Sequence, residues 1–137
     1  MIEDFVEYIC GLLNIEVPEV RVLKDEALTD TTLACVIDGV VYIESMKPSP
    51  DLLFSVAHEL RHLWQAETDR GLYFKDYKTL RELRDVNAYN QQPAEPDANA
   101  FASAIMAANF GISPTFDALS EDTKASIEAR AKELWSK

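Results

Sequence analysis

Several residue types are scarce in this 137-residue chain, and each scarcity excludes a class of protein. Cys10 and Cys35 are too few for a disulfide-stabilised scaffold and belong to no Cys-x-x-Cys pair, so we expect two reduced, small core residues. Glycine occurs four times and proline six times while 47% of residues are hydrophobic, which excludes fibrous and disordered proteins. The chain has no apolar run of about 18 residues, so we expect no membrane-spanning helix.

Basic residues are also scarce. Lysine and arginine total 13 against 24 acidic residues, which gives a formal net charge of −11. This charge repels phosphate, so we expect no direct binding to nucleic acid or to an anionic membrane. The first residues, MIEDFVEYIC, carry acids where a secretory signal peptide carries lysine or arginine. We therefore expect a cytoplasmic protein, and the length fits a single domain over residues 1–137.

Hydrophobic spacing predicts the elements of the N-terminal half. Apolar residues recur at helical spacing over the first fourteen positions, which predicts an amphipathic helix ending near Asn14. Residues 20–24 are predicted to form a short strand. Asp38-Gly39 joins two β-branched runs and favours a hairpin of strands near 32–37 and 40–44, because both turn positions favour positive φ. Together these segments predict a small, three-stranded, mostly antiparallel sheet.

The C-terminal half is predicted to be helical. Ser49 is a candidate N-cap with Pro50 at the first helical position, which predicts a helix from there to about Glu67. Its predicted core stripe is Leu53, Val56, Ala57, Leu60, Leu63 and Trp64. A short helix is predicted around residues 80–84. A longer helix has Pro96 in its first turn and a cap at Gly111. Ser113-Pro114 is predicted to start another short helix, and a last helix runs from a cap at Ser120 to about Trp135. This order predicts an α+β fold in which the sheet packs against the helix of residues 50–67.

Both histidines of the chain lie in one pentapeptide, His58-Glu-Leu-Arg-His62. Positions i and i+4 of a helix face the same way, so the two imidazoles can bind one zinc ion. Glu59 lies about 60–100° around the helix from them, where its carboxylate can contact a metal-bound water without binding the metal. Zinc acidifies such a water, and the carboxylate accepts its proton and passes it to the leaving amine. The alternative is a solvated pair of surface histidines, because a five-residue pattern gives false positives.

A catalytic zinc site usually has a third protein ligand, and here it must be an acidic residue because no further histidine and no suitable cysteine is present. The acidic candidates after the pentapeptide are Glu67, Asp69, Asp76, Glu82, Asp85, Glu95, Asp97, Asp117 and Glu121. Glu95 begins a new helix with enough intervening chain to fold back, and Asn99 one turn later is a candidate hydrogen-bond partner for a ligand imidazole. Stabilisation of the helix start is the alternative role for Glu95 and Asp97.

The segments AHELRH and QQPAEPDANAFASAIM resemble the ImmA/IrrE family of metallopeptidases, which are similar to gluzincins. The resemblance covers roughly residues 36–110. It implies that His58, His62 and Glu95 bind Zn²⁺, that Glu59 is the general base, and that Phe101 and Ala102 are packing residues. Arg61 stands where this family often has glycine, a departure that would narrow the cleft or indicate a different partner.

A peptidase of this type also needs a hydrogen-bond donor for the tetrahedral intermediate, usually histidine or tyrosine. Tyr73, Tyr77 and Tyr89 lie between the two zinc-binding segments, and simple packing is the alternative role for each. We favour Tyr89 as the catalytic tyrosine because it is nearest to Glu95 in the sequence.

These observations predict a zinc-dependent endopeptidase that cuts a specific cytoplasmic protein, and the family resemblance suggests a DNA-binding repressor as that substrate. The substrate is expected to pair with the strand of residues 40–44 as an exposed sheet edge. The alternative function is a non-enzymatic protein-interaction module that zinc stabilises.

Overall fold

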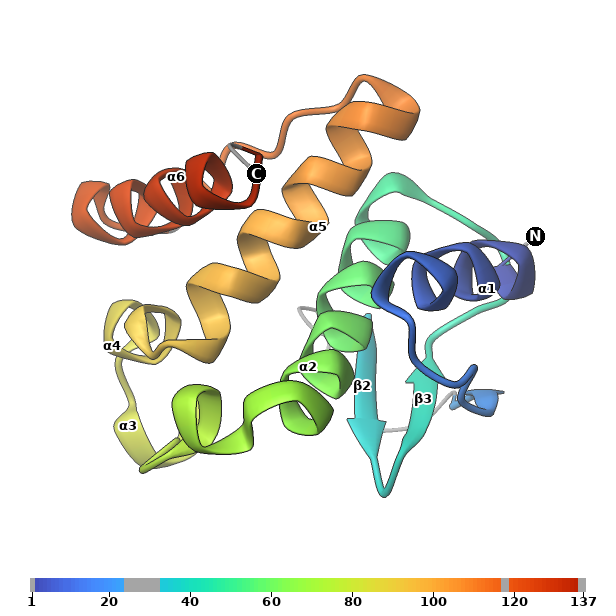
Figure 1. The fold of residues 1–137 in the computed structure, drawn as a ribbon, viewed down its shortest axis with the longest axis horizontal. Coiled ribbons are helices and arrows are strands. Elements are labelled where there is room, and N and C mark those ends of the chain that lie inside the picture. Colours follow the sequence, from blue (N-terminus) through green and yellow to red (C-terminus); the bar gives the residue numbers. More distant parts are fainter. Residues whose placement is uncertain (1, 24–32, 117–118, 136–137) are drawn as a thin grey trace. The chain divides into compact units, whose positions relative to one another are not determined.

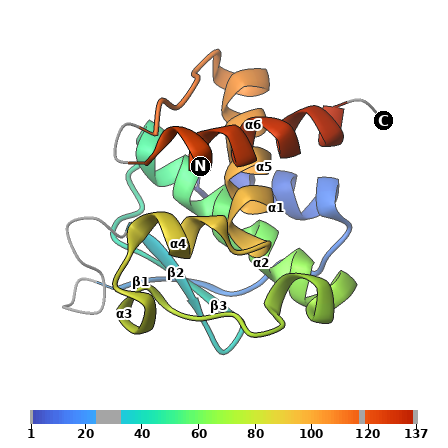
Figure 2. The same cartoon turned by 90° about the vertical axis from the view of Figure 1, so that its left-hand side faces the viewer.

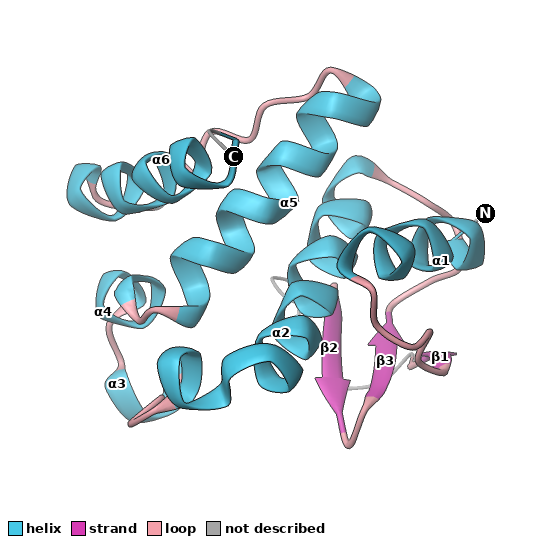
Figure 3. Ribbon diagram, in the orientation of Figure 1, coloured by secondary structure: helices cyan, strands magenta, loops and turns pink. Residues whose placement is uncertain are grey.

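The computed structural model describes residues 2–23, 33–116 and 119–135, and it confirms an α+β fold that is mostly helical (Figure 1, Figure 3). In this part of the chain the elements are α1 (Ile2–Leu13), β1 (Val20–Val22), β2 (Ala34–Ile37), β3 (Val40–Ile43), α2 (Pro50–Phe74), α3 (Leu80–Leu83), α4 (Val86–Gln91), α5 (Ala94–Phe110) and α6 (Glu121–Trp135). None of the described helices is both long and apolar enough to cross a membrane.

Contacts divide the chain into two compact units, Met1–Trp64 and Gln65–Lys137, which we call the N-terminal and the C-terminal unit. The boundary falls inside α2, so this helix contributes its first part to one unit and its last part to the other. A single domain over residues 1–137 stays a prediction.

The sheet of the N-terminal unit is mixed, with the strand order β1-β3-β2. The Asp38-Gly39 turn joins β2 and β3 as an antiparallel hairpin, and both turn residues have positive φ as predicted (51° and 78°). On its other side β3 pairs in parallel with β1, with Val20 opposite Val41. The prediction that residues 40–44 form an edge strand is therefore wrong, because β1 occupies that side of β3. Among the described strands, β2 lies at an edge.

The core of the N-terminal unit forms between one face of β3 and the apolar faces of α1 and α2. Val41 and Ile43 are two residues apart, so they point to the same side of the sheet, and both are fully buried. The helices contribute Ile2, Val6, Ile9, Cys10 and Leu13 from α1, and Leu52, Val56, Ala57 and Leu60 from α2. This core holds the helix that carries the histidines.

Helix α2 begins as predicted, because the Ser49 hydroxyl accepts a hydrogen bond from the Leu52 N–H at 3.2 Å. Its regular part ends at Asp69, whose φ of −158° and ψ of 78° are not helical, close to the predicted end at Glu67. The predicted core stripe is partly wrong. Leu52, Arg61 and Gln65 are buried while Leu53, Leu63 and Trp64 are only half-buried, so the buried side of the helix is rotated from the predicted one.

In the C-terminal unit, α5 ends at Gly111, whose φ of 65° forms the predicted cap, and Ser120 caps α6 by accepting from the Thr123 N–H. Helix α3 matches the predicted short helix, whereas α4, capped by Asp85, was not predicted. The predicted short helix at Ser113-Pro114 is wrong for the described residues 111–116, which contain no helix. The left-handed φ of Phe116 (53°) is incompatible with continuing a right-handed helix there.

Helix α6 crosses α5 in this unit (Figure 2), and a partly buried ion pair joins them. Arg130 Nε donates to Asp97 Oδ1 at 2.8 Å, and Asp97 is 1% exposed. Burial of such a pair requires donors around the carboxylate. Asp97 has a second donor, because its Oδ2 accepts a hydrogen bond from the Gln65 side chain at 2.8 Å. These bonds tie the last part of α2, the first turn of α5 and α6 together.

Candidate functional site

The two histidines lie one turn apart on α2, and both are half-buried. Their Nε2 atoms are 3.0 Å apart, and their rings are nearly perpendicular, with an interplanar angle of 86° and centroids 4.6 Å apart. Two nitrogens that bind a tetrahedral zinc ion at about 2.0–2.1 Å lie roughly 3.3 Å from each other. The pair is therefore arranged as two ligands of one ion would be, apart from a movement of a few tenths of an ångström.

Glu59 is half-buried and lies on the same turn of α2. Its negative charge influences a cysteine of the sheet. The pKa of the Cys35 thiol is raised, first by burial and then by the negative charge of Glu59. Cys35 is on β2, so the Glu59 carboxylate lies within electrostatic reach of the sheet edge. This position suits a general base that meets a peptide near that edge.

Arg61, between the two histidines, is 6% exposed. Its guanidinium carbon lies 3.6 Å from the centroid of the Trp64 ring, a cation–π contact that stabilises a partly desolvated cation.

In the C-terminal unit, Glu95 lies in the first turn of α5 and is 1% exposed. The Tyr77 hydroxyl is 2.8 Å from Glu95 Oε2 and 2.9 Å from the Tyr89 hydroxyl. A phenol has one proton, and the carboxylate is the stronger acceptor, so Tyr77 donates to Glu95 and accepts from Tyr89. The pKa of Tyr77 is raised far above its ordinary value, mainly by burial and then by the charge of Glu95, so Tyr77 remains a proton donor.

The other acidic candidates for a metal ligand differ from Glu95 in burial or in partners. Asp97 is equally buried, but Gln65 and Arg130 bind its two oxygens. The remaining described candidates are exposed, namely Glu67, Asp69, Asp76, Glu82, Asp85 and Glu121. Three of these accept from the N–H groups of a helical turn, namely Asp69, Glu82 and Asp85, and Asp117 lies outside the described residues.

Sequence reasoning missed the residues that support Glu95. The Gln92 side chain accepts from the Lys78 N–H at 2.7 Å and donates to the Lys78 carbonyl at 2.8 Å. These two hydrogen bonds from one side chain to the backbone of Lys78 fix the chain next to Tyr77. No periodicity or motif indicates such a contact, because it joins two loop residues fourteen positions apart. Asn99, predicted as a partner of a ligand imidazole, donates to Asn90 at 3.4 Å.

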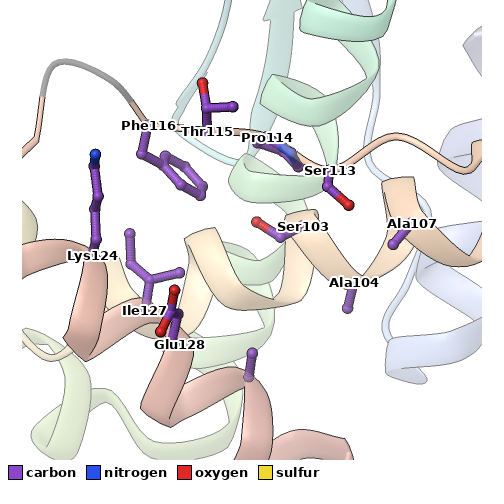
Figure 4. Close-up of a pocket in the computed structure, with 11 residues that line it drawn as sticks. Ser103, Ala104, Ala107, Ser113, Pro114, Thr115, Phe116, Lys124, Ile127 and Glu128 are labelled. Carbon is purple, nitrogen blue, oxygen red and sulfur yellow. The ribbon is translucent and has the colours of Figure 1, made fainter.

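A pocket of about 280 Å³ lies elsewhere in the C-terminal unit, between α5, α6 and residues 113–116 (Figure 4). Ser103 and Ala104 of α5, Phe116 of the loop, and Lys124 and Ile127 of α6 line it. None of the predicted site residues lines this pocket, so it is separate from the candidate site.

Residues 18–131 match the Peptidase_M78 family, described as the IrrE N-terminal-like domain, and this match covers most of the chain. The chain belongs to this family. The resemblance found in the sequence is thereby confirmed, and the function is of the metallopeptidase type. No curated protein and no solved structure is significantly similar to the chain. The matched residues include every described strand and helix except α1, and they end within α6.

The position of Glu59 relative to β2 can be tested in the metal-free protein. In Glu59→Gln the negative charge beside Cys35 is removed, so the pKa of the thiol falls and more thiolate forms. We expect alkylation of Cys35 at pH 8 to accelerate, because a lower thiol pKa gives more thiolate at a fixed pH. Mass spectrometry of the alkylated peptides measures the rate. Glu44→Gln is the matched control and should leave it unchanged, and equal rates in wild type and Glu59→Gln would place Glu59 away from β2.

Proposed function

We propose that this chain is a zinc-dependent endopeptidase in which His58, His62 and Glu95 bind the ion and Glu59 is the general base. The observation that carries the proposal is the convergence of the two Nε2 atoms at 3.0 Å, with Glu59 between the histidines, in a member of a peptidase family. His58, His62 and Glu95 each offer one ligand atom and form a group that could hold a metal ion.

The bonding around Glu95 supports its assignment as the third ligand. Gln65 lies three residues beyond His62 on α2, and its side chain donates to the Ala94 carbonyl at 2.9 Å and to Asp97 at 2.8 Å. The residues on either side of Glu95 are thus hydrogen-bonded to the helix that carries the histidines. A buried carboxylate beside such a helix fits the two-histidine, one-carboxylate donor set of hydrolytic zinc sites.

The chemistry follows from the roles of the side chains. When bound, zinc lowers the pKa of the attacking water and polarises the peptide carbonyl. Glu59 accepts the proton of that water and returns it to the leaving amine. Tyr89 is proposed to donate to the oxygen of the tetrahedral intermediate. Its hydroxyl is bonded to Tyr77 at 2.9 Å, so this role requires the Tyr89 hydroxyl to rotate away from Tyr77 when the substrate binds.

We propose that the substrate is one specific protein that presents an extended, neutral-to-basic segment. The chain has a net charge of −11, which disfavours acidic peptides. Strand β2 is at the sheet edge, and its Cys35 is within electrostatic reach of Glu59. A substrate strand paired with β2 would gain backbone hydrogen bonds that do not depend on sequence, so selectivity must come from docking of the folded partner. By family resemblance, that partner is a DNA-binding repressor.

The metal ligands are tested by zinc content. Wild-type protein is expected to bind about one zinc ion per chain, and Glu95→Ala should lose most of it because two imidazoles alone hold zinc weakly. Asp97→Ala should have a milder effect, since its partners are Gln65 and Arg130. Elemental analysis of the purified variants measures the content. If Glu95→Ala retains all of its zinc, Glu95 is not a ligand, and Glu82 or Asp85 becomes the candidate for the third ligand.

The general base is tested by a variant that keeps the shape of the side chain. Glu59→Gln cannot accept a proton, so zinc should be retained while peptide hydrolysis falls about 10²–10⁴-fold. Tyr89→Phe should also retain zinc and lower kcat. Hydrolysis by Glu59→Gln at the wild-type rate would exclude this mechanism. Zinc binding without any hydrolysis by the wild-type protein would instead favour the interaction module.

Partner-directed cleavage is tested by comparing two substrates. We expect slow, scattered cleavage of casein and efficient cleavage at a single site in one repressor, because docking rather than the cleft provides selectivity. Mass spectrometry of the digests identifies the sites and their rates, with a chelator-treated sample as control. If casein is cut at many sites as fast as any repressor is cut, the protein is a general peptidase.

A further inference from the structure

We propose that Tyr77 is a positioning residue that makes Glu95 bind the metal through one oxygen only. The second oxygen of Glu95 is held by the Tyr77 hydroxyl, so one coordination position stays open for the substrate. This inference rests on the proposed zinc site and names a residue that would control its geometry.

The contact that carries the inference is short, charge-assisted and shielded from water. The Tyr77 hydroxyl lies 2.8 Å from Glu95 Oε2, and Glu95 is 1% exposed. Hydrogen bonds from neutral donors to carboxylates are stronger than those between neutral groups. Because water has little access to Glu95, losing this donor would leave a buried oxygen that must find another partner.

The choice between one and two bound oxygens matters for catalysis. A carboxylate that bound zinc through both oxygens would add a fifth donor atom and crowd the position that a catalytic site keeps open beside its three protein ligands. With Oε2 bonded to Tyr77, Glu95 would bind the ion through Oε1. The donor to Oε2 therefore maintains a three-ligand site with one open position.

Tyr77 is itself held in place by several independent contacts. Gln92 bonds both the N–H and the carbonyl of Lys78, the next residue in the chain. The chain reverses after α2 at Asp76, whose φ is 58°, and the Tyr77 ring packs edge-on against Phe74 with centroids 5.2 Å apart. Gln92 lies three residues before Glu95, so the same side chain fixes the donor close to its acceptor. Such preorganisation is typical of residues that orient a metal ligand.

Tyr89 completes the arrangement by fixing the direction of the Tyr77 proton. The two hydroxyls are 2.9 Å apart, and the rings contact at an angle of 65°. If Tyr89 donates to Tyr77, the Tyr77 proton can only point to Glu95. Tyr89 therefore fixes this proton before the substrate binds, and under the proposed mechanism its hydroxyl turns to the reacting oxygen afterwards while Tyr77 stays bonded to Glu95.

The experiment measures metal binding and metal geometry without relying on turnover. Zinc affinity is determined by competition with a chelating dye for wild type, Tyr77→Phe and Tyr73→Phe. We expect Tyr77→Phe to bind zinc about 10–100-fold more weakly, the usual effect of removing a partner of a metal ligand. In the Co²⁺-substituted protein, the visible absorption of Tyr77→Phe should weaken, as happens when four-coordinate cobalt becomes five-coordinate.

Tyr73→Phe is the matched control because Tyr73 is a buried tyrosine of the same unit whose hydroxyl bonds Arg130 rather than a metal ligand. It should keep wild-type zinc affinity and the wild-type cobalt spectrum. Tyr77→Phe with the same affinity and spectrum as wild type would overturn the inference and leave the zinc site intact. A wild-type protein that binds no zinc would overturn both.

Two measurements keep the test decisive if Tyr77→Phe does not fold. Gln92→Ala retains the Tyr77 hydroxyl but removes the bonds to Lys78, so it should weaken zinc binding several-fold in the same direction. X-ray absorption of the wild-type zinc protein counts the bound oxygens directly. Two oxygens of Glu95 on the ion in the wild type would overturn the inference.

Discussion

Two neighbouring carboxylates of α5, Glu95 and Asp97, are each 1% exposed, and a buried carboxylate costs several kcal/mol unless donors surround it. Much of the C-terminal unit is arranged to provide those donors. Tyr77 serves Glu95, while Gln65 and Arg130 serve Asp97, and these three donors come from a loop and two different helices. The positive end of the α5 dipole adds to the stabilisation of both acids in its first turn.

The two carboxylates have different functions because their oxygens have different partners. Both oxygens of Asp97 are bonded to side chains of the protein, which makes it a structural joint between α2, α5 and α6. Glu95 has one oxygen bonded to Tyr77, and under our proposal the other binds the metal.

The N-terminal unit has a different structural role, because it holds the polar face of α2 near an edge of the sheet. Leu60 and the other apolar residues of α2 pack with α1 and β3, and this buries one side of the helix while the histidines stay half-buried. Because β1 and β2 pair with the two sides of β3, these two outer strands are the edges of the described sheet. The family match covers residues 18–131, so it includes the sheet and α2 of this unit.

The features that the sequence determined by itself are those that depend on nearby residues. The cap at Ser49, the Asp38-Gly39 turn and the one-turn spacing of His58 and His62 each involve residues within four positions, where backbone preferences and helical geometry decide the outcome. The hairpin and the histidine helix were therefore predictable from the residues alone. Glu95 was not: nine acidic residues were candidates, and family resemblance rather than spacing selected it.

Only the tertiary structure decided which distant groups meet. It placed β3 between β1 and β2, rotated the buried side of α2 to include Gln65, and brought Tyr77 to Glu95 eighteen residues away. Such contacts form when whole elements pack, and their free energy comes from burying surface and satisfying polar groups far apart in the chain. No local pattern encodes them. The burial of Glu95 and its bond to Tyr77 depend on that packing.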